Sequence, residues 1–180
     1  GRAQGGGGRP GAGGPPRRRR SGRPGSLRFA VFHTWTLQDE VLIAEGVPVF
    51  DFLDGSAGGA LGGTSAHVLN ANMGRWNNGL GIFANLNYAS PTEVAAQSGL
   101  LRFSDLVTAD LRIGYEFNYS DKIVNAVPFL EETRLALNIR NILDEKIQVT
   151  DETGATPFAF QEDILDPFGR TWRLELRKRF

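Results

Sequence analysis

The sequence predicts an all-β fold, an antiparallel up-and-down segment of a transmembrane β-barrel that contains about six strands and is not a complete barrel. Three observations lead to this fold class. Apolar and polar residues alternate with a period of two after residue 25, as in strands with one apolar face. The alternating segments are about 9–12 residues long, which suits tilted strands that cross a hydrocarbon layer. Longer and shorter connections alternate between them, as external loops and turns do in outer-membrane barrels.

Six segments carry the alternation. It is clearest at 107–117, where Leu111 and Ile113 fall on one face and Asp110 and Arg112 fall on the other. The six predicted strands are 27–37, 66–75, 80–89, 102–117, 134–140 and 172–179. No segment has the 3.6-residue period of a convincing helix, so we expect none.

The second and third predicted strands meet at Asn77-Asn78-Gly79. An Asn-Gly pair accepts the positive φ angles that a tight two-residue hairpin turn requires. The sequence therefore predicts a β-hairpin at this position.

Alternation alone does not separate a soluble sandwich from a membrane barrel. The connections and the aromatic residues favour the barrel. The long connections run over 38–65, 90–103 and 144–167, and the shorter ones over 76–79 and 118–131. Aromatic residues lie near the strand ends, as in interfacial girdles: Trp35 and Tyr88 at one rim, Trp76, Tyr115 and Tyr119 at the other, and Trp172 at the start of the last strand.

The composition divides the chain into two parts, a segment 1–25 rich in Gly, Pro and Arg and a body 26–180. The first part contains seven arginines and no acidic residue, so the formal net charge of +0 leaves the body at −7. We expect segment 1–25 to be disordered because it has almost nothing apolar to bury. The Arg17–Arg20 run is interpreted as part of a flexible linker, with contact to anionic lipid or to nucleic acid as alternatives. No aromatic residue interleaves the arginines to stack on bases, and we expect no nucleic-acid partner.

Several function classes find little support. The chain has no Cys, which excludes disulfide scaffolds, thiol catalysis and Cys-ligated zinc. No run of 18 consecutive apolar residues is present, so no transmembrane helix is expected. His33 and His67 lie on different segments, and no Gly-x-Ser-x-Gly motif accompanies them. We expect neither an enzyme nor a cofactor.

Three motifs near the end of the chain resemble those of one family. They are Leu-Asn-Ile-Arg-Asn-Ile-Leu-Asp-Glu-Lys at 137–146, Asp-Pro-Phe-Gly-Arg-Thr-Trp at 166–172, and Arg-Lys-Arg-Phe at 177–180. In this order and spacing they resemble the C-terminal end of TonB-dependent outer-membrane receptors. The resemblance covers roughly 150 residues and is most specific in the last 45.

The resemblance implies a location, a function and a set of partners. The location is the outer membrane of a Gram-negative bacterium, and the function is active uptake of a scarce, siderophore-like ligand through a lipid-embedded wall. The barrel assembly machinery is expected to read a terminal signal made of Trp172, Leu174, Leu176 and Phe180. Lys178 departs from the apolar alternation of this signal, and its long stem can reach the membrane interface.

Six strands do not close a barrel, which needs about eight or more. Two unpaired edges in lipid would leave backbone groups without hydrogen bonds. We therefore expect the chain to be a fragment, whose partners are the remaining barrel strands and an N-terminal plug. Contact with TonB is expected only through that plug, and closure by several copies of the chain is an alternative.

The long connections hold the candidate ligand residues. Phe50 and Phe52 flank Asp51 in a Gly-rich loop, and their rings could stack on a ligand or pack inside the loop. Loop 144–167 is acidic, and its Asp151, Glu152 and Asp163 complete the candidate set. Clustered carboxylates can attract cations, but the bland interpretation is a solvated acidic loop, and no metal site is expected.

Charged residues on the polar face are expected to form ladders between neighbouring strands. The arginines are Arg112, Arg134, Arg140 and Arg173, and the acids are Asp110, Glu116 and Glu175. Two other functions remain as alternatives to the receptor: a passive outer-membrane porin or adhesin, and a soluble β binding domain with a basic nucleic-acid arm. The ligand itself is not identified by the sequence.

Overall fold

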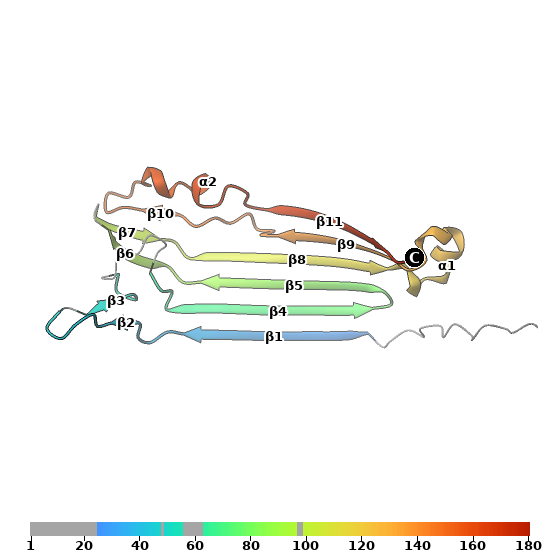
Figure 1. The fold of residues 1–180 in the computed structure, drawn as a ribbon, viewed down its shortest axis with the longest axis horizontal. Coiled ribbons are helices and arrows are strands. Elements are labelled where there is room, and N and C mark those ends of the chain that lie inside the picture. Colours follow the sequence, from blue (N-terminus) through green and yellow to red (C-terminus); the bar gives the residue numbers. More distant parts are fainter. Residues whose placement is uncertain (1–24, 48, 56–62, 97–98) are drawn as a thin grey trace, which may run out of the picture.

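The computed structural model of the chain describes residues 25–47, 49–55, 63–96 and 99–180. Six antiparallel strands form its main sheet in the order in which they follow one another along the chain (Figure 1). They are β1 (Ser26–Trp35), β4 (His67–Asn77), β5 (Leu80–Ala89), β8 (Leu106–Glu116), β9 (Thr133–Arg140) and β11 (Thr171–Lys178). The predicted all-β, antiparallel arrangement is confirmed. The predicted disordered segment 1–25 lies outside the described residues except for Gly25.

The main sheet has two edges. β1 pairs only with β4, and β11 pairs only with β9, among the residues that the structure describes. The sheet therefore does not close on itself within these ranges.

The long connections contain strands of their own. A three-stranded sheet has the order β10-β7-β6, with β6 at Thr92–Ala96, β7 at Gly99–Phe103 and β10 at Val149–Thr150. A two-stranded sheet pairs β2 (Glu40–Val41) with β3 (Phe50–Asp51). Both small sheets lie at one end of the main sheet, which is called the loop end below (Figure 1).

Two boundaries differ from the prediction as a result. The predicted connection 90–103 is the hairpin of β6 and β7, and the predicted strand 102–117 is divided between β7 and β8. Ser104 and Asp105 separate these two strands, and the Ser104 N–H donates to Gln148 O at 2.8 Å. That bond ties the break to the chain leading into β10, so the alternation runs through residues that belong to two different sheets.

Short helices occupy the connection between β8 and β9 at the opposite end, called the turn end. They are the 3₁₀ helix η1 (Phe117–Tyr119), α1 (Asp121–Ala126) and the 3₁₀ helix η2 (Pro128–Leu130). The loop end has η3 (Phe158–Phe160) and α2 (Glu162–Leu165). The expectation of no helix is therefore wrong, because elements this short show no helical period. No helix in the described ranges has the length and apolarity to span a membrane.

The predicted hairpin turn joins β4 to β5. Asn78 has φ 44° and Gly79 has φ 86°, the two positive values of a type I′ turn. Gly79 is buried, and a Cβ there would lie 2.6 Å from Glu116 O. The Glu116 N–H donates to Gly79 O at 2.9 Å, so the turn is also bonded to the end of β8.

The compact hydrophobic core lies at the loop end and not beneath the main sheet. It is called the loop-end core, and its buried members are Val94, Leu101, Phe103 and Val149. Phe160 packs edge-on against Phe103, with ring centroids 5.8 Å apart. In contrast, most apolar side chains of the main sheet are partly or largely exposed.

Two aromatic rings of the main sheet pack over glycines on the neighbouring strand. In β4 and β5, Trp76 pairs with Gly81 and Gly74 pairs with Phe83. A Cβ added to Gly81 would lie 2.6 Å from the Trp76 ring, and one added to Gly74 would lie 2.9 Å from the Phe83 ring. Each glycine thus leaves the space that the opposite ring fills, which fixes the pairing of these strands.

We predict that Gly81→Ala destabilises the sheet by about 1–3 kcal/mol, because the Trp76 ring must leave its position. Gly114→Ala is the matched control, since its Cβ would make only ordinary contacts, the nearest at 3.5 Å to Arg134. That change should be neutral or stabilise by about 0.4–1 kcal/mol. Urea unfolding of the chain in phospholipid micelles measures both, and equal effects would contradict the packing argument.

Candidate functional site

The main sheet has one largely apolar face, interrupted by Arg75 near the turn end and by His33 and His67 near the loop end. The strand register aligns Ile82 with Ile113, Ile113 with Leu137, and Leu137 with Leu174 across four neighbouring strands. Positions in steps of two from these residues share the same side. The apolar face consists of Leu27, Phe29, Val31, Met73, Leu80, Ile82, Leu86, Val107, Leu111, Ile113, Leu135, Leu137, Ile139, Trp172, Leu174 and Leu176.

The apolar face is largely uncovered in this structure: its side chains on the edge strands are exposed, those of the middle strands are partly exposed, and Ile139 is buried. The exposed fractions of Leu27, Phe29 and Leu174 are 71%, 69% and 70%. Contiguous exposed apolar surface of this kind marks contact with a membrane or with another protein. The face is therefore the first candidate functional surface.

Aromatic residues lie near both ends of the sheet, but they do not all share the apolar face. Tyr88 and Trp172 lie on it near the loop end, and Tyr115 lies on it near the turn end. Trp76 is at the predicted rim but on the opposite face, over Gly81, with Tyr119 packed edge-on against its indole at 6.0 Å. Trp76 is therefore part of the interstrand packing and not of a girdle on the apolar side.

The structure brings the two histidines together. His33 of β1 and His67 of β4 lie on adjacent strands on the apolar side, and their Nε2 and Nδ1 atoms are 3.3 Å apart. The Trp35 ring lies 5.6 Å from that of His67. Their distant positions in the sequence gave no sign of this pairing, which needs the β1–β4 register.

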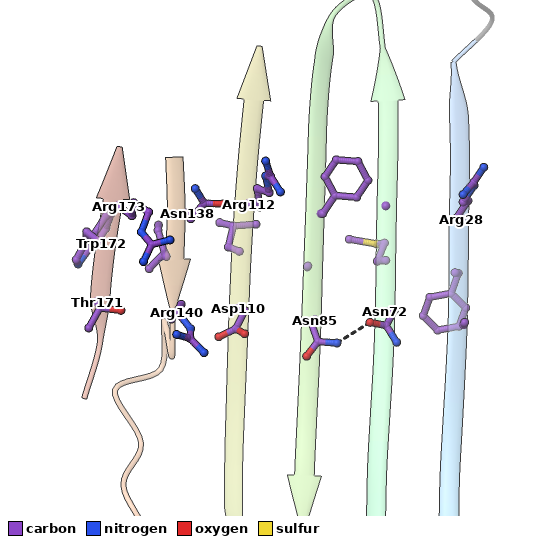
Figure 2. Close-up of a pocket in the computed structure, with 18 of the residues that line it drawn as sticks. Arg28, Asn72, Asn85, Asp110, Arg112, Asn138, Arg140, Thr171, Trp172 and Arg173 are labelled. Carbon is purple, nitrogen blue, oxygen red and sulfur yellow. Dashed lines mark hydrogen bonds between the residues drawn. The ribbon is translucent and has the colours of Figure 1, made fainter. Parts of the chain in front are cut away.

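The other side of the sheet is polar and forms a groove of about 1260 Å³ (Figure 2). The Asn85 side chain donates to Asn72 Oδ1 at 2.5 Å, which links β5 to β4 on this face. The labelled polar residues of the groove are Arg28, Asn72, Asn85, Asp110, Arg112, Asn138, Arg140, Thr171 and Arg173.

The predicted charge ladders form only in part. Arg134 of β9 lies 3.9 Å from Glu116 of β8, the one expected pair across neighbouring strands that the described residues contain. Asp110 instead accepts the backbone N–H of Asn141 at 2.9 Å. Glu175 pairs with Arg177 on its own strand at 3.5 Å.

The candidate ligand residues do not form one site. Phe50 and Asp51 make up β3, and the backbone of Phe52 bonds to Asp39 and Thr64. The same loop is bonded to β6, because the Ala95 N–H donates to Gly55 O at 2.7 Å. Residues 151 and 152 follow β10, which lies on the far side of β7. The hairpin of β6 and β7 thus stands between the two groups.

The three acidic candidate residues of loop 144–167 each have a local partner. Asp151 accepts the hydroxyl of Thr153 at 2.6 Å, and this bond, with backbone N–H groups from Thr153 to Ala155, lowers the pKa of its carboxyl below the ordinary 3.8. Glu152 accepts the Leu100 N–H at 3.0 Å. Such carboxylates stabilise loop structure by anchoring backbone turns.

Asp163 is bound to Lys146, with 3.0 Å between Oδ1 and Nζ, and this hydrogen bond raises the pKa of Lys146. In the ranges that the structure describes, no three His, Asp or Glu side chains are grouped so as to hold a metal ion. The acidic loop is therefore built from separate contacts.

The two longer C-terminal motifs bind each other. The contacts among Asn141, Asp144, Asp166, Gly169 and Arg170 are called the motif clasp. Asp144 accepts the Arg170 N–H at 2.7 Å and lies 3.4 Å from its guanidinium, while Asp166 accepts the Gly169 N–H at 3.0 Å.

The conformation of the clasp explains its residue types. Asn141, Asp144 and Gly169 all have positive φ, at 49°, 59° and 52°, a region that Asn, Asp and Gly tolerate best. The buried Asn141 side chain donates to Glu145 O at 2.8 Å and accepts the Glu145 N–H at 3.2 Å. The motifs could be read from the sequence, but their contact joins residues about 26 positions apart and needs the β9–β11 pairing.

The terminal strand exposes the residues of the expected assembly signal. Trp172, Leu174 and Leu176 project from β11 on the apolar face, and Phe180 is fully exposed beyond the strand. The ammonium of Lys178 turns to the carbonyl oxygens of Phe129 and Glu131 in the turn-end connection. That contact gives a physical reason for a lysine at this position.

We predict that Asp144→Ala destabilises the chain by about 1–2 kcal/mol, because a backbone N–H and a guanidinium lose their acceptor. Asp144→Asn keeps an acceptor and a tolerance of positive φ, so it should cost less. Asp163→Ala is the control, since this carboxylate is 93% exposed and binds a single ammonium, so its removal should cost less than that of Asp144. Urea unfolding in phospholipid micelles measures the unfolding free energy of the three variants. If Asp163→Ala lowers it as much as Asp144→Ala does, the special role of the clasp is refuted.

Comparison with known protein families, with curated proteins and with solved structures finds no match to this chain.

Proposed function

We propose that the main sheet is a lipid-facing wall segment of an outer-membrane receptor of the TonB-dependent kind, which takes up a scarce ligand such as a siderophore. The observation that carries this proposal is the largely exposed, mainly apolar face, which runs over six antiparallel strands with Arg75 as a charged interruption near the turn end. Water disfavours such a surface, whereas acyl chains cover it without cost. In this arrangement the polar face meets water inside the barrel.

The strand lengths support a membrane-spanning wall. β8 has 11 residues, which at ~3.3 Å per residue and a tilt near 45° cover about 25 Å. That height matches the apolar band of outer-membrane barrels. The small sheets and the longest connections then gather on one side of the membrane, as external loops do (Figure 1).

The two edges of the sheet define the partners in this proposal. In lipid, the unpaired backbone groups of β1 and β11 need further strands, because neither water nor acyl chains satisfy them there. We therefore propose that the remaining barrel strands join at these edges. A plug inside the barrel would connect it to TonB, and the proposal gives the chain no catalytic step.

A passive porin or adhesin is the second candidate, because the same two-faced sheet would serve it equally well. The motif clasp favours the receptor, since it is built from the residues whose order resembles that family. A plug-like domain in the same reading frame upstream would support the receptor, and its absence would support the passive pore. Recovery of the chain in the aqueous fraction without detergent would exclude both and favour a soluble binding domain.

The apolar face predicts that an arginine destabilises the sheet on one side of β8 and has little effect on the other side. Leu111→Arg should destabilise the chain in phospholipid micelles by about 2–4 kcal/mol, because the new charge would lie near the middle of the hydrocarbon layer. Leu174→Arg should act alike. Thr108→Arg on the polar face of β8 is the matched control and should change the unfolding free energy by less than about 1 kcal/mol.

Spin labels give an independent measurement of the same proposal. Labels at Ile113 and Leu176 should be quenched by oxygen dissolved in the lipid and protected from aqueous quenchers. The reverse result, or equal effects of Leu111→Arg and Thr108→Arg, would overturn the wall assignment.

The exposed terminal residue predicts a contact with the barrel assembly machinery. Phe180→Ser should lower the yield of crosslinks between the chain and the purified machinery in proteoliposomes, because an aromatic anchor is lost. Phe158→Ser, which changes an exposed ring at the loop end, should leave the yield unaltered. Equal yields for the two variants would count against a terminal signal.

A further inference from the structure

Three arginines surround one asparagine on the polar face of the sheet. The register places Arg112 of β8 and Arg173 of β11 directly opposite Asn138 of β9, one on each side. Arg140 follows two residues along β9, on the same face, opposite Thr171. Figure 2 shows these four labelled side chains on the three neighbouring strands. Arg112, Arg140 and Arg173 are called the arginine cluster.

The arginine cluster has no ion pair among the described residues. The nearest acids of this face are engaged elsewhere: Asp110 accepts the Asn141 N–H, and Glu175 pairs with Arg177. Glu116, farther along β8, is the partner of Arg134. Among the described residues, no carboxylate forms an ion pair with a guanidinium of the cluster, although Asp110 and Glu175 lie on the same face.

This arrangement gathers three positive charges on one surface. Strands lie about 4.8 Å apart, so the three guanidinium groups are held on neighbouring positions of one surface, where like charges repel. All three side chains are exposed on the groove, and so are open to a solute. Guanidinium groups bind carboxylate and phosphate through paired, charge-assisted hydrogen bonds. The amide of Asn138 supplies a further donor between them.

We propose that the arginine cluster and Asn138 bind an oxyanion, so that the ligand of this protein is an anionic solute bearing carboxylate or phosphate groups. Charge complementarity selects this class, and the groove of about 1260 Å³ has room for a small molecule. The inference deepens the proposed function and rests on it in one respect, that the polar face meets water.

Titration of the full chain in uncharged detergent micelles at low salt tests the proposal, with citrate as the carboxylate probe and pyrophosphate as the phosphate probe. Isothermal calorimetry should detect saturable binding of at least one of the two probes, with one probe molecule bound per chain. The better probe identifies the group that the site prefers. Arg112→Gln, Arg140→Gln and Arg173→Gln should each weaken binding by about 10- to 100-fold, because each removes a charge-assisted contact.

Lysine variants and one distant arginine make the test specific. Arg112→Lys and Arg173→Lys keep the charge but lose the planar pair of donors, so they should weaken binding less than the glutamine variants. Arg75→Gln removes an equal charge from the apolar side of β4 and should leave binding unaltered. All variants keep the Arg17–Arg20 run, so binding of the probes there cancels in the comparison. Far-UV circular dichroism confirms that each variant retains its strands.

Three results would overturn the inference. The first is that neither probe shows saturable binding. The second is that Arg75→Gln weakens binding as much as the glutamine variants of the arginine cluster do. The third is binding of an acidic peptide in place of both small anions, which would make the polar face a protein docking surface. Oxygen quenching of a spin label at Leu174 in the same samples separates the two proposals. A lipid-exposed label without anion binding refutes only the oxyanion site, whereas a water-exposed label refutes only the membrane wall.

Discussion

The register between neighbouring strands is the constraint on which the other features of the main sheet depend. Side chains alternate between the two sides of a strand, so a slip of one residue would move apolar groups to the polar side throughout that strand. The β4–β5 pairing is held by the two-residue turn at Asn78 and Gly79 and by the rings of Trp76 and Phe83 over glycines. The apolar face, the groove and the arginine cluster all follow from this alignment.

The six long strands could be predicted from the sequence because each carries its own period-two pattern and most are flanked by clear breaks. The hairpin turn was equally readable, since Asn-Gly has a direct conformational meaning. The elements of the loop end could not be read in the same way. β10 has two residues and α2 has four, which is too short for any period to appear. Val94, Leu101 and Val149 form a core only after three segments have met, and that meeting is a tertiary event.

The candidate site shows the same division between local and tertiary information. Counting charges on one face correctly placed Arg112, Arg140 and Arg173 together, but it assigned them partners that the structure gives to other groups. A carboxylate can be captured by a backbone N–H that no pattern of residue types reveals, as happens to Asp110. The pairing of His33 with His67 was missed for a related reason, since it depends on two strands joined by a long connection.

The motif clasp closes the base of the segment that leaves β9 and returns to β11. The contacts between Asp144 and Arg170 hold the two ends of this excursion together, and lengthening the chain between them adds closure entropy only slowly. β10 and Val149, within this segment, belong to the loop-end core, so insertions are best tolerated outside them. The exposed turn at Thr153 and Gly154 is therefore a place where foreign residues could be grafted while the β9–β11 pairing keeps its alignment.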